Sequence, residues 1–176
     1  MAIATVGLAT RASFADHYVV PTGSMEPTVH VGDHILVTKA AYGLRIPLTD
    51  RWLTTFDGPE RGDVVVLDAP PPDAPIVLLK RVVAIGGDNV EVRSGHVSID
   101  GVAVTEPTVQ VANDGYAPGG PDYGPLQVPA GKLLVLGDNR GNSRDGRTFG
   151  LVDRKRVLGR AVAVVGREGK PTYEPL

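Results

Sequence analysis

Residues 77–85 read Val-Leu-Leu-Lys-Arg-Val-Val-Ala-Ile, an apolar and largely β-branched run that one Lys-Arg pair interrupts. Such a run predicts a buried β-strand. A lysine is almost never fully buried without a partner or a chemical role. Lys80 is therefore either an edge-strand residue whose amine reaches solvent or a desolvated amine that acts as a base. A base must be neutral, and lowering a lysine pKa to near 7–8 costs roughly 4 kcal/mol, which apolar surroundings can supply.

The rest of the chain also favours a mostly β fold. Its 176 residues include 22 glycines and 15 prolines, which predict many turns between short strands. Residues 69–75 and 112–124 are predicted to be loops, and no helix longer than a short turn is expected. We expect strands at His34–Lys39, Asp63–Leu67, Ile76–Ile85, Asn89–Arg93, His96–Ile99, Lys132–Leu136 and Leu158–Val165.

A serine lies between two prolines near the start of the chain. Residues 21–28 read Pro-Thr-Gly-Ser-Met-Glu-Pro-Thr. Each proline restricts its own φ and keeps the preceding residue extended, while Gly23 permits backbone shapes that a Cβ would resist. Ser24 is thus presented on a stiff loop, as a nucleophile requires. From this segment alone, an ordinary turn and a nucleophile loop fit equally well.

A polar loop follows the predicted strand at residues 132–136. Residues 137–147 read Gly-Asp-Asn-Arg-Gly-Asn-Ser-Arg-Asp-Gly-Arg. The alternation of acidic residues with glycine suggests a calcium loop, but no glutamate closes the loop and three arginines lie inside it. A loop that orients other polar groups is the better interpretation.

Composition excludes several classes of function. Eighteen basic and twenty acidic residues leave a net charge of −2, so the chain lacks the basic character of a nucleic-acid binder. The absence of cysteine excludes disulfides and thiol catalysis. The four histidines show no metal-ligand spacing, and we expect neither a metal nor another cofactor. His30 is the one alternative base near Ser24 in the sequence.

The order of these segments resembles that of the bacterial type I signal peptidases, which are serine peptidases of family S26 with a Ser-Lys dyad. The resemblance covers about residues 18–165. It rests on the segment around Ser24, on residues 31–37 and 61–66, on Lys80 with its neighbours and Gly87-Asp88, and on the polar loop. The fold that it implies is an antiparallel β catalytic core with a small inserted β lobe.

The family resemblance implies a role for each site residue. Ser24 would be the nucleophile and Lys80 the general base, and the Ser24 N–H and the Thr22 hydroxyl would form the oxyanion hole. Threonine at position 22 keeps the hydroxyl of the serine that is frequent in the family. Ser143 would hydrogen-bond the Lys80 amine. The other supporting residues would be an Arg81–Asp145 ion pair with Asp138 and Arg147 nearby.

The substrate that the resemblance implies is a secretory preprotein. Its signal peptide would be cut after a small-x-small sequence such as Ala-x-Ala, through an acyl-enzyme. The residues expected to line the substrate pockets are Val20, Met25, Ile35, Leu78 and Leu79. A conjugation-pilus maturation peptidase and a self-cleaving repressor-type protease are the alternatives, although residues 1–23 contain neither Ala-Gly nor Cys-Gly. A non-enzymatic β-rich binding module would have no reason to combine these segments.

The expected organisation has three parts. Residues 18–86 and 131–176 would form the catalytic core, residues 87–130 the inserted lobe, and residues 1–17 the approach to a membrane anchor. Only ten residues precede Arg11, and these cannot span a bilayer, which needs about 20 apolar residues. We expect a monomer that works at a phospholipid surface. In the bacterial inner (plasma) membrane its catalytic domain would lie on the periplasmic or outer face.

Overall fold

The structure is a computed structural model that describes residues 15–45, 52–55, 58–72, 75–106, 109 and 119–176. Its main element is an eight-stranded antiparallel sheet with the order β1-β2-β13-β5-β6-β11-β12, in which β14 also pairs with β13. The strands are β1 (Ala15–Val19), β2 (His34–Thr38), β5 (Val64–Asp68), β6 (Val77–Ile85), β11 (Lys132–Leu136), β12 (Val152–Asp153), β13 (Val157–Arg167) and β14 (Lys170–Pro175).

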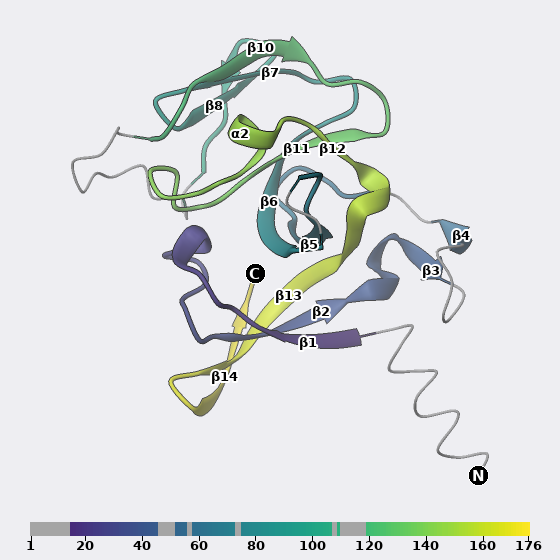
Figure 1. The fold of residues 1–176 in the computed structure, drawn as a ribbon, viewed down its shortest axis with the longest axis vertical. Coiled ribbons are helices and arrows are strands. Elements are labelled where there is room, and N and C mark those ends of the chain that lie inside the picture. Colours follow the sequence, from purple (N-terminus) through teal and green to yellow (C-terminus); the bar gives the residue numbers. More distant parts are fainter. Residues whose placement is uncertain (1–14, 46–51, 56–57, 73–74, 107–108, 110–118) are drawn as a thin grey trace.

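A second antiparallel sheet has the order β10-β7-β8-β9. It consists of β7 (Asn89–Arg93), β8 (His96–Ile99), β9 (Val102–Ala103) and β10 (Tyr123–Gln127). A separate hairpin pairs β3 (Gly43–Arg45) with β4 (Trp52–Thr55). Helical turns are short: η1 (Gly23–Met25), η2 (Lys39–Tyr42), α2 (Gly146–Phe149) and η3 (Arg154–Arg156). In Figure 1 the second sheet lies above the large one, whose strands β6 and β11 are on the side toward it.

The mostly β fold predicted from the sequence is confirmed. All seven predicted strands are present, as β2, β5, β6, β7, β8, β11 and β13. One predicted loop is partly wrong, because β10 begins at Tyr123, inside residues 112–124. Most of that segment, and residues 1–14 of the predicted membrane approach, lie outside the described residues. The limits predicted for the inserted lobe stay a prediction.

The same tight turn precedes three strands. Each turn has a glycine with positive φ, which favours a residue without Cβ, followed by an aspartate. The turns are Gly32-Asp33 before β2, Gly62-Asp63 before β5 and Gly87-Asp88 before β7. In each, the carboxylate accepts the N–H of the residue three positions earlier, at 2.8 to 3.0 Å. In each turn one valine from a neighbouring segment pairs with both residues: its carbonyl accepts the glycine N–H, and its own N–H donates to the aspartate carbonyl. These valines are Val20 for the first turn, Val82 for the second and Val128 for the third. The first turn therefore fixes Val20 just before the Ser24 loop.

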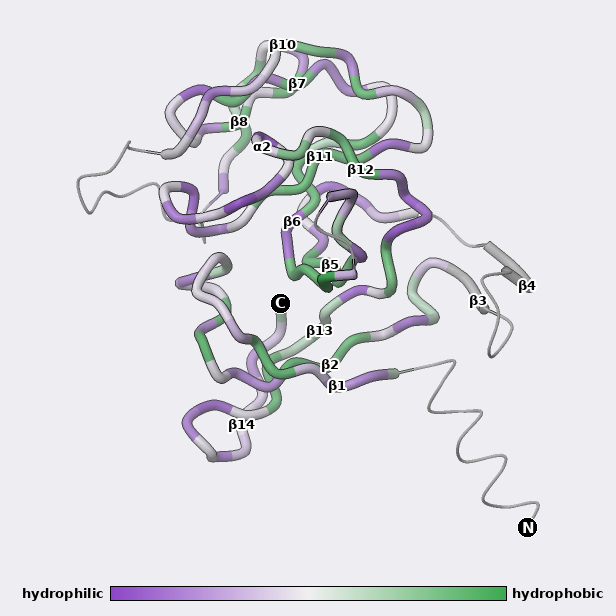
Figure 2. Tube along the Cα trace, in the orientation of Figure 1, coloured by the Kyte–Doolittle hydropathy of each residue, from purple (hydrophilic) through white to green (hydrophobic). Residues whose placement is uncertain are grey.

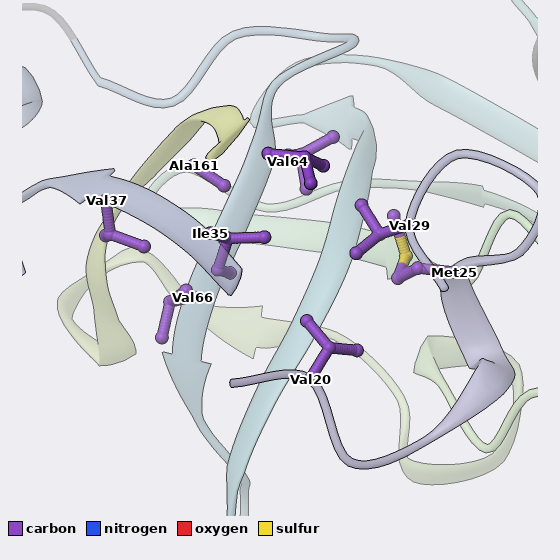
Figure 3. Close-up of a cluster of buried hydrophobic side chains, with 9 residues drawn as sticks. Val20, Met25, Val29, Ile35, Val37, Val64, Val66 and Ala161 are labelled. Atoms are coloured by element: carbon purple, nitrogen blue, oxygen red, sulfur yellow. The ribbon is translucent and has the colours of Figure 1, made fainter. Parts of the chain in front are cut away.

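Apolar side chains form three buried clusters. One joins the two sheets, with Ala84 and Leu134 of the large sheet packed against Val90 and Ile99 of the small one. Another packs Val65 and Val82 near Tyr42. The third lies beneath the Ser24 loop (Figure 3), and its members are Val20, Met25, Val29, Ile35, Val37, Val64, Val66, Ala161 and Val164. In Figure 2 the strands β5 and β11 are accordingly hydrophobic, while the turn between β13 and β14 is hydrophilic.

Candidate active site

Ser24 lies in the single turn η1 that follows β1. The turn is closed by a hydrogen bond from the Glu26 N–H to the Gly23 carbonyl at 3.1 Å, and the next turn by one from Val29 to Met25 at 3.0 Å. The Met25 side chain is 1 % exposed and belongs to the core beneath the loop. Because Met25 anchors the turn from below, Ser24 is held half-buried at the surface.

Lys80 lies near the middle of β6, opposite Val65 of β5. Its side chain is 3 % exposed, so the sequence-based alternative of an edge lysine in solvent is wrong. The Nζ atom donates hydrogen bonds to Ser24 Oγ at 2.6 Å and to the Leu79 carbonyl at 2.9 Å. Residues 56 positions apart in the chain are thus in direct contact.

Burial lowers the pKa of the Lys80 amine from 10.5 to about 8. The cause is desolvation, which disfavours the charged form. The negative charges of Asp145 and Asp138 act in the opposite direction and are the weaker influence. At pH 7 an amine with this pKa is neutral in roughly one molecule in ten, which is about 300 times more than for an ordinary lysine.

A groove of about 270 Å³ opens at this pair of residues. Thr22, Ser24 and Lys80 line it, and so do all five residues predicted to contact substrate, Val20, Met25, Ile35, Leu78 and Leu79. Its exposed rim is apolar and includes Val19, Ile76 and Val77. A larger depression of about 490 Å³ lies near Tyr42 and Lys155, and its described lining residues include no serine, threonine or histidine. The groove at Ser24 is therefore the candidate active site.

The polar loop lies against the back of the Ser24 loop. The Asn139 N–H donates to the Ser24 carbonyl and its side-chain amide donates to the Gly23 carbonyl, both at 3.2 Å. The Thr28 hydroxyl donates to Asp138 Oδ2 at 2.5 Å. A Cβ at Gly137 would collide with Ser143 Oγ and the Ser24 carbonyl, so only glycine allows the two loops to approach this closely.

The predicted ion pair between Arg81 and Asp145 is wrong. Arg81 instead binds both oxygens of Asp138, at 2.8 and 2.6 Å, and Asp145 binds Arg147 at 2.8 Å. The reason lies in the sheet register, because Arg81 of β6 is opposite Leu136 of β11, two residues before Asp138. Asp145 caps the N-terminus of α2 and also accepts the Gly137 N–H at 3.0 Å, so it is held beside Arg147.

Ser143 does not make the hydrogen bond that was predicted. Its Oγ is buried and has no hydrogen-bond partner among the described residues, whereas the Lys80 amine bonds Ser24 and Leu79. The hydroxyl lies against Gly137, on the side of the polar loop that faces the Ser24 carbonyl. The predicted orienting role of Ser143 has no direct contact to support it in this structure.

Comparison with known proteins places the chain in a family. The family model described as signal peptidase, peptidase S26, matches residues 1–166. The chain belongs to this family. The predicted resemblance is thereby confirmed, and at the level of the family so is the enzyme class, signal peptidase I.

Individual relatives agree with this assignment. The chain is 35 % identical over 162 residues to a probable signal peptidase I-2 of Synechocystis, covering 89 % of this chain and 65 % of the relative. It is 35 % identical over 174 residues to a signal peptidase I of Leptolyngbya laminosa, covering 91 % and 76 %. The chain thus spans about two thirds to three quarters of the length of these relatives. A crystal structure of a signal peptidase I from Enterococcus faecalis is similar, with a TM-score of 0.50 and 29 % identity over 60 % of this chain and 98 % of that one.

The described residues offer neither a cluster of metal ligands nor a membrane-spanning helix. Within the ranges that the structure describes, no three His, Asp or Glu side chains gather as a metal site would require. In the same ranges no helix has the length and apolar character needed to cross a bilayer. The alternative base His30 is exposed, and its ring lies 3.8 Å from the Asp33 carboxylate.

No role for Asn139 or Thr28 was predicted from the sequence, although both lie in the segments that carry the family resemblance. Tyr18, Ile76 and Val77 were likewise not assigned to the groove that they line. The sequence signal for these three was their position within two residues of Val20 or Leu78, which were predicted to line it. No comparable signal existed for Asn139, because its contact to the Gly23 carbonyl joins positions 116 residues apart.

Proposed function

We propose that this protein is a signal peptidase I that removes signal peptides from secretory preproteins with a Ser24–Lys80 dyad. The observation that carries the proposal is the 2.6 Å contact between a buried lysine amine and a serine hydroxyl. The contact lies in an apolar groove, in a chain of the signal peptidase family. A lysine with a pKa of about 8 can accept a proton near neutral pH.

Acylation begins when Ser24 Oγ attacks the carbonyl carbon of the scissile peptide bond. The serine proton moves to neutral Lys80, and the carbonyl oxygen becomes an oxyanion. The Ser24 N–H and the Thr22 hydroxyl stabilise this charge as the oxyanion hole. When the carbon–nitrogen bond breaks, the Lys80 ammonium returns the proton to the leaving amine, and the mature protein departs with a free N-terminus.

Deacylation repeats this chemistry with water as the nucleophile. Neutral Lys80 takes a proton from a water molecule that attacks the ester carbon, and the proton finally returns to Ser24 Oγ. The signal peptide leaves with a new carboxylate. These steps use only groups of the chain and of the substrate, and they require no cofactor.

The lining of the groove supports the proposed preference for small side chains on both sides of an intervening residue. Leu78 and Leu79 lie on β6 beside Lys80, and Val20, Met25 and Ile35 form the floor. These floor residues are at most 4 % exposed, so they are packed into the core and cannot move aside for a large substrate residue. An extended substrate segment would lie along this surface through main-chain hydrogen bonds.

The apolar rim of the groove supports the proposal that the protein cleaves its substrates at the membrane surface. Val19, Ile76 and Val77 are exposed beside the opening, where the apolar signal segment of a preprotein would remain in the bilayer. We expect a monomer in the inner membrane with this domain on the periplasmic or outer face. Phospholipid vesicles should increase both binding and cleavage, and an unchanged cleavage rate would argue against the surface role.

The test uses a precursor peptide that contains Ala-x-Ala, with mass spectrometry to locate the cut. Ser24→Ala should abolish cleavage and lower the unfolding free energy by no more than about 1 kcal/mol, because the serine side chain is half-buried, lies outside the core and loses only its hydrogen bond with Lys80. Ser98→Ala on β8 of the second sheet is the matched control and should cleave as the unaltered chain does. Cleavage by Ser24→Ala at more than a trace would refute the proposed nucleophile.

A further inference from the structure

Asn139 donates hydrogen bonds to the backbone carbonyls of Gly23 and Ser24. Its side-chain amide donates to the Gly23 carbonyl at 3.2 Å, and its own backbone N–H donates to the Ser24 carbonyl at 3.2 Å. The Gly23 carbonyl also accepts the Glu26 N–H at 3.1 Å, so the oxygen has two donors. No other side chain among the described residues is recorded as a donor to this carbonyl.

The Gly23 carbonyl and the Ser24 N–H belong to one planar peptide unit. In a trans peptide the two groups point in opposite directions, so a donor that fixes the oxygen also fixes the direction of the N–H. A hydrogen bond to the oxygen further polarises the unit and makes its N–H a stronger donor, because hydrogen bonds in a chain reinforce one another. Asn139 therefore acts on the N–H that would hold the oxyanion, from the opposite side of the peptide.

The asparagine is itself held in place. The Asn142 N–H donates to the Asn139 carbonyl at 3.0 Å. The preceding residue, Asp138, accepts the Thr28 hydroxyl at 2.5 Å and is bound by Arg81 at 2.6 Å. Since Thr28 lies four residues after Ser24, both ends of the nucleophile loop are tied to the same two residues of the polar loop. These contacts fix the backbone of Asn139, so that its side-chain amide is presented to the Gly23 carbonyl from a preorganised position.

We propose that Asn139 is a positioning residue for the oxyanion hole, which it directs and polarises through the Gly23–Ser24 peptide. The inference rests on the proposed function, because it presupposes that Ser24 is the nucleophile and that its N–H faces the oxyanion. Asn139 is not one of the described residues that line the groove. Its contribution should therefore appear when charge develops on the substrate oxygen and not when the substrate binds.

The first measurement compares Asn139→Asp and Asn139→Ala with the unaltered chain on the precursor peptide. Both variants keep the backbone N–H to Ser24, and both remove the side-chain donor. Loss of a complete oxyanion-hole donor lowers kcat by about 10²–10³-fold. Weakening one donor should therefore lower kcat by about 10–100-fold, with KM changed less than about twofold. Asn89→Ala, an exposed asparagine on β7, should keep full kcat.

The second measurement separates positioning from a merely structural role. In a peptide boronic acid the Ser24 oxygen adds to boron while Lys80 takes the serine proton, and the resulting tetrahedral anion places an oxygen in the hole. The Asn139 variants should bind this inhibitor more weakly by the same factor as they lose kcat/KM. Their affinity for a peptide with a non-cleavable bond should stay unchanged. A structural role would weaken both ligands together.

The outcomes separate the two proposals. If the unaltered chain cleaves and Ser24→Ala does not, but the Asn139 variants keep kcat and boronate affinity, the positioning role is overturned and the proposed function stands. An equal loss for both ligands would also overturn the positioning role. A chain that fails to cleave any Ala-x-Ala precursor would overturn both.

Discussion

Replacing Lys80 by methionine should remove activity and at the same time stabilise the fold near neutral pH. Methionine has a similar length, carries no charge and suits the apolar surroundings of a 3 % exposed side chain. Each pKa unit corresponds to about 1.4 kcal/mol. A pKa lowered from 10.5 to about 8 therefore makes the protein about 3 kcal/mol less stable at pH 7 than it would be with the lysine neutral in both states.

The lowered pKa of Lys80 determines whether the stability of the protein rises or falls with pH. Because the folded pKa is the lower one, the unfolded chain binds more protons between pH 8 and 10.5, and the stability of the unaltered protein rises with pH across that window. By pH 10 the penalty falls to about 1 kcal/mol. Methionine carries no such penalty, so its advantage should shrink by about 2.5 kcal/mol from pH 7 to pH 10. The lost hydrogen bonds to Ser24 and Leu79 cost about 1 kcal/mol at either pH and leave this difference unchanged.

Urea unfolding followed by circular dichroism at pH 7 and pH 10 gives the required free energies. Titration of all other groups is common to both proteins and cancels in the comparison. Lys170→Met, an exposed lysine on β14, is the control and should show no pH-dependent advantage. If Lys80→Met is less stable than the unaltered chain by the same amount at both pH values, burial does not lower the pKa of the lysine and the reasoning fails.

Three other predictions follow from the site. The cleavage rate should rise about tenfold per pH unit up to about pH 8 and then level off, as the Lys80 amine becomes neutral, and a flat pH profile would contradict Lys80 as the base. Lys80→Arg should be inactive, because guanidinium keeps its proton. The Ser143→Ala variant should have an unfolding free energy equal to or higher than that of the unaltered chain, because the hydroxyl that is removed is buried without a partner among the described residues. Its activity should fall less than that of Lys80→Ala. Asp145→Ala should lower the unfolding free energy by about 3–5 kcal/mol, since it leaves the buried Arg147 charge uncompensated. Asp153→Ala removes one partner of an exposed ion pair and should leave the unfolding free energy nearly unchanged; equal losses in the two variants would show that burial is not the cause.

Strands whose side chains pack on one or both faces could be predicted from the sequence. The apolar runs of β5, β6 and β11 reflect burial, and burial is what a hydrophobic pattern records. Strand β14 reads Lys-Pro-Thr-Tyr-Glu-Pro and is almost entirely exposed, so its sequence looks like a loop. Its backbone pairing with β13 alone makes it a strand. Strands β9 and β12 have two residues each and leave no pattern to detect.

The residues of the candidate site likewise divide into those that could be predicted from the sequence and those that could not. Ser24 and Lys80 stand out because each conflicts with its local sequence, one as a hydroxyl in a rigid turn and one as a charge in an apolar strand. The ion-pair partners could not be inferred, because two arginines and two aspartates allow both pairings. Only the β6–β11 register, which brings Arg81 to Asp138, decides between them. The unpartnered hydroxyl of Ser143 is likewise a property of packing, to which the sequence has no access.

The position of β13 in the large sheet has a consequence for the order in which the protein is made. In the order β1-β2-β13-β5-β6, the strands flanking the Ser24 loop are linked to the strand of Lys80 through β13, and β13 follows both in the chain. While synthesis has not yet reached Val157, the two halves of the dyad belong to separate strand pairs that no shared strand connects, and contacts through the polar loop, such as those of Asp138 with Thr28 and Arg81, join the nucleophile loop to β6. Contacts over such sequence separations form late, because the loop between them must close first. A nascent chain should therefore remain proteolytically silent until β13 has been inserted, which delays the appearance of an active peptidase until its sheet is nearly complete.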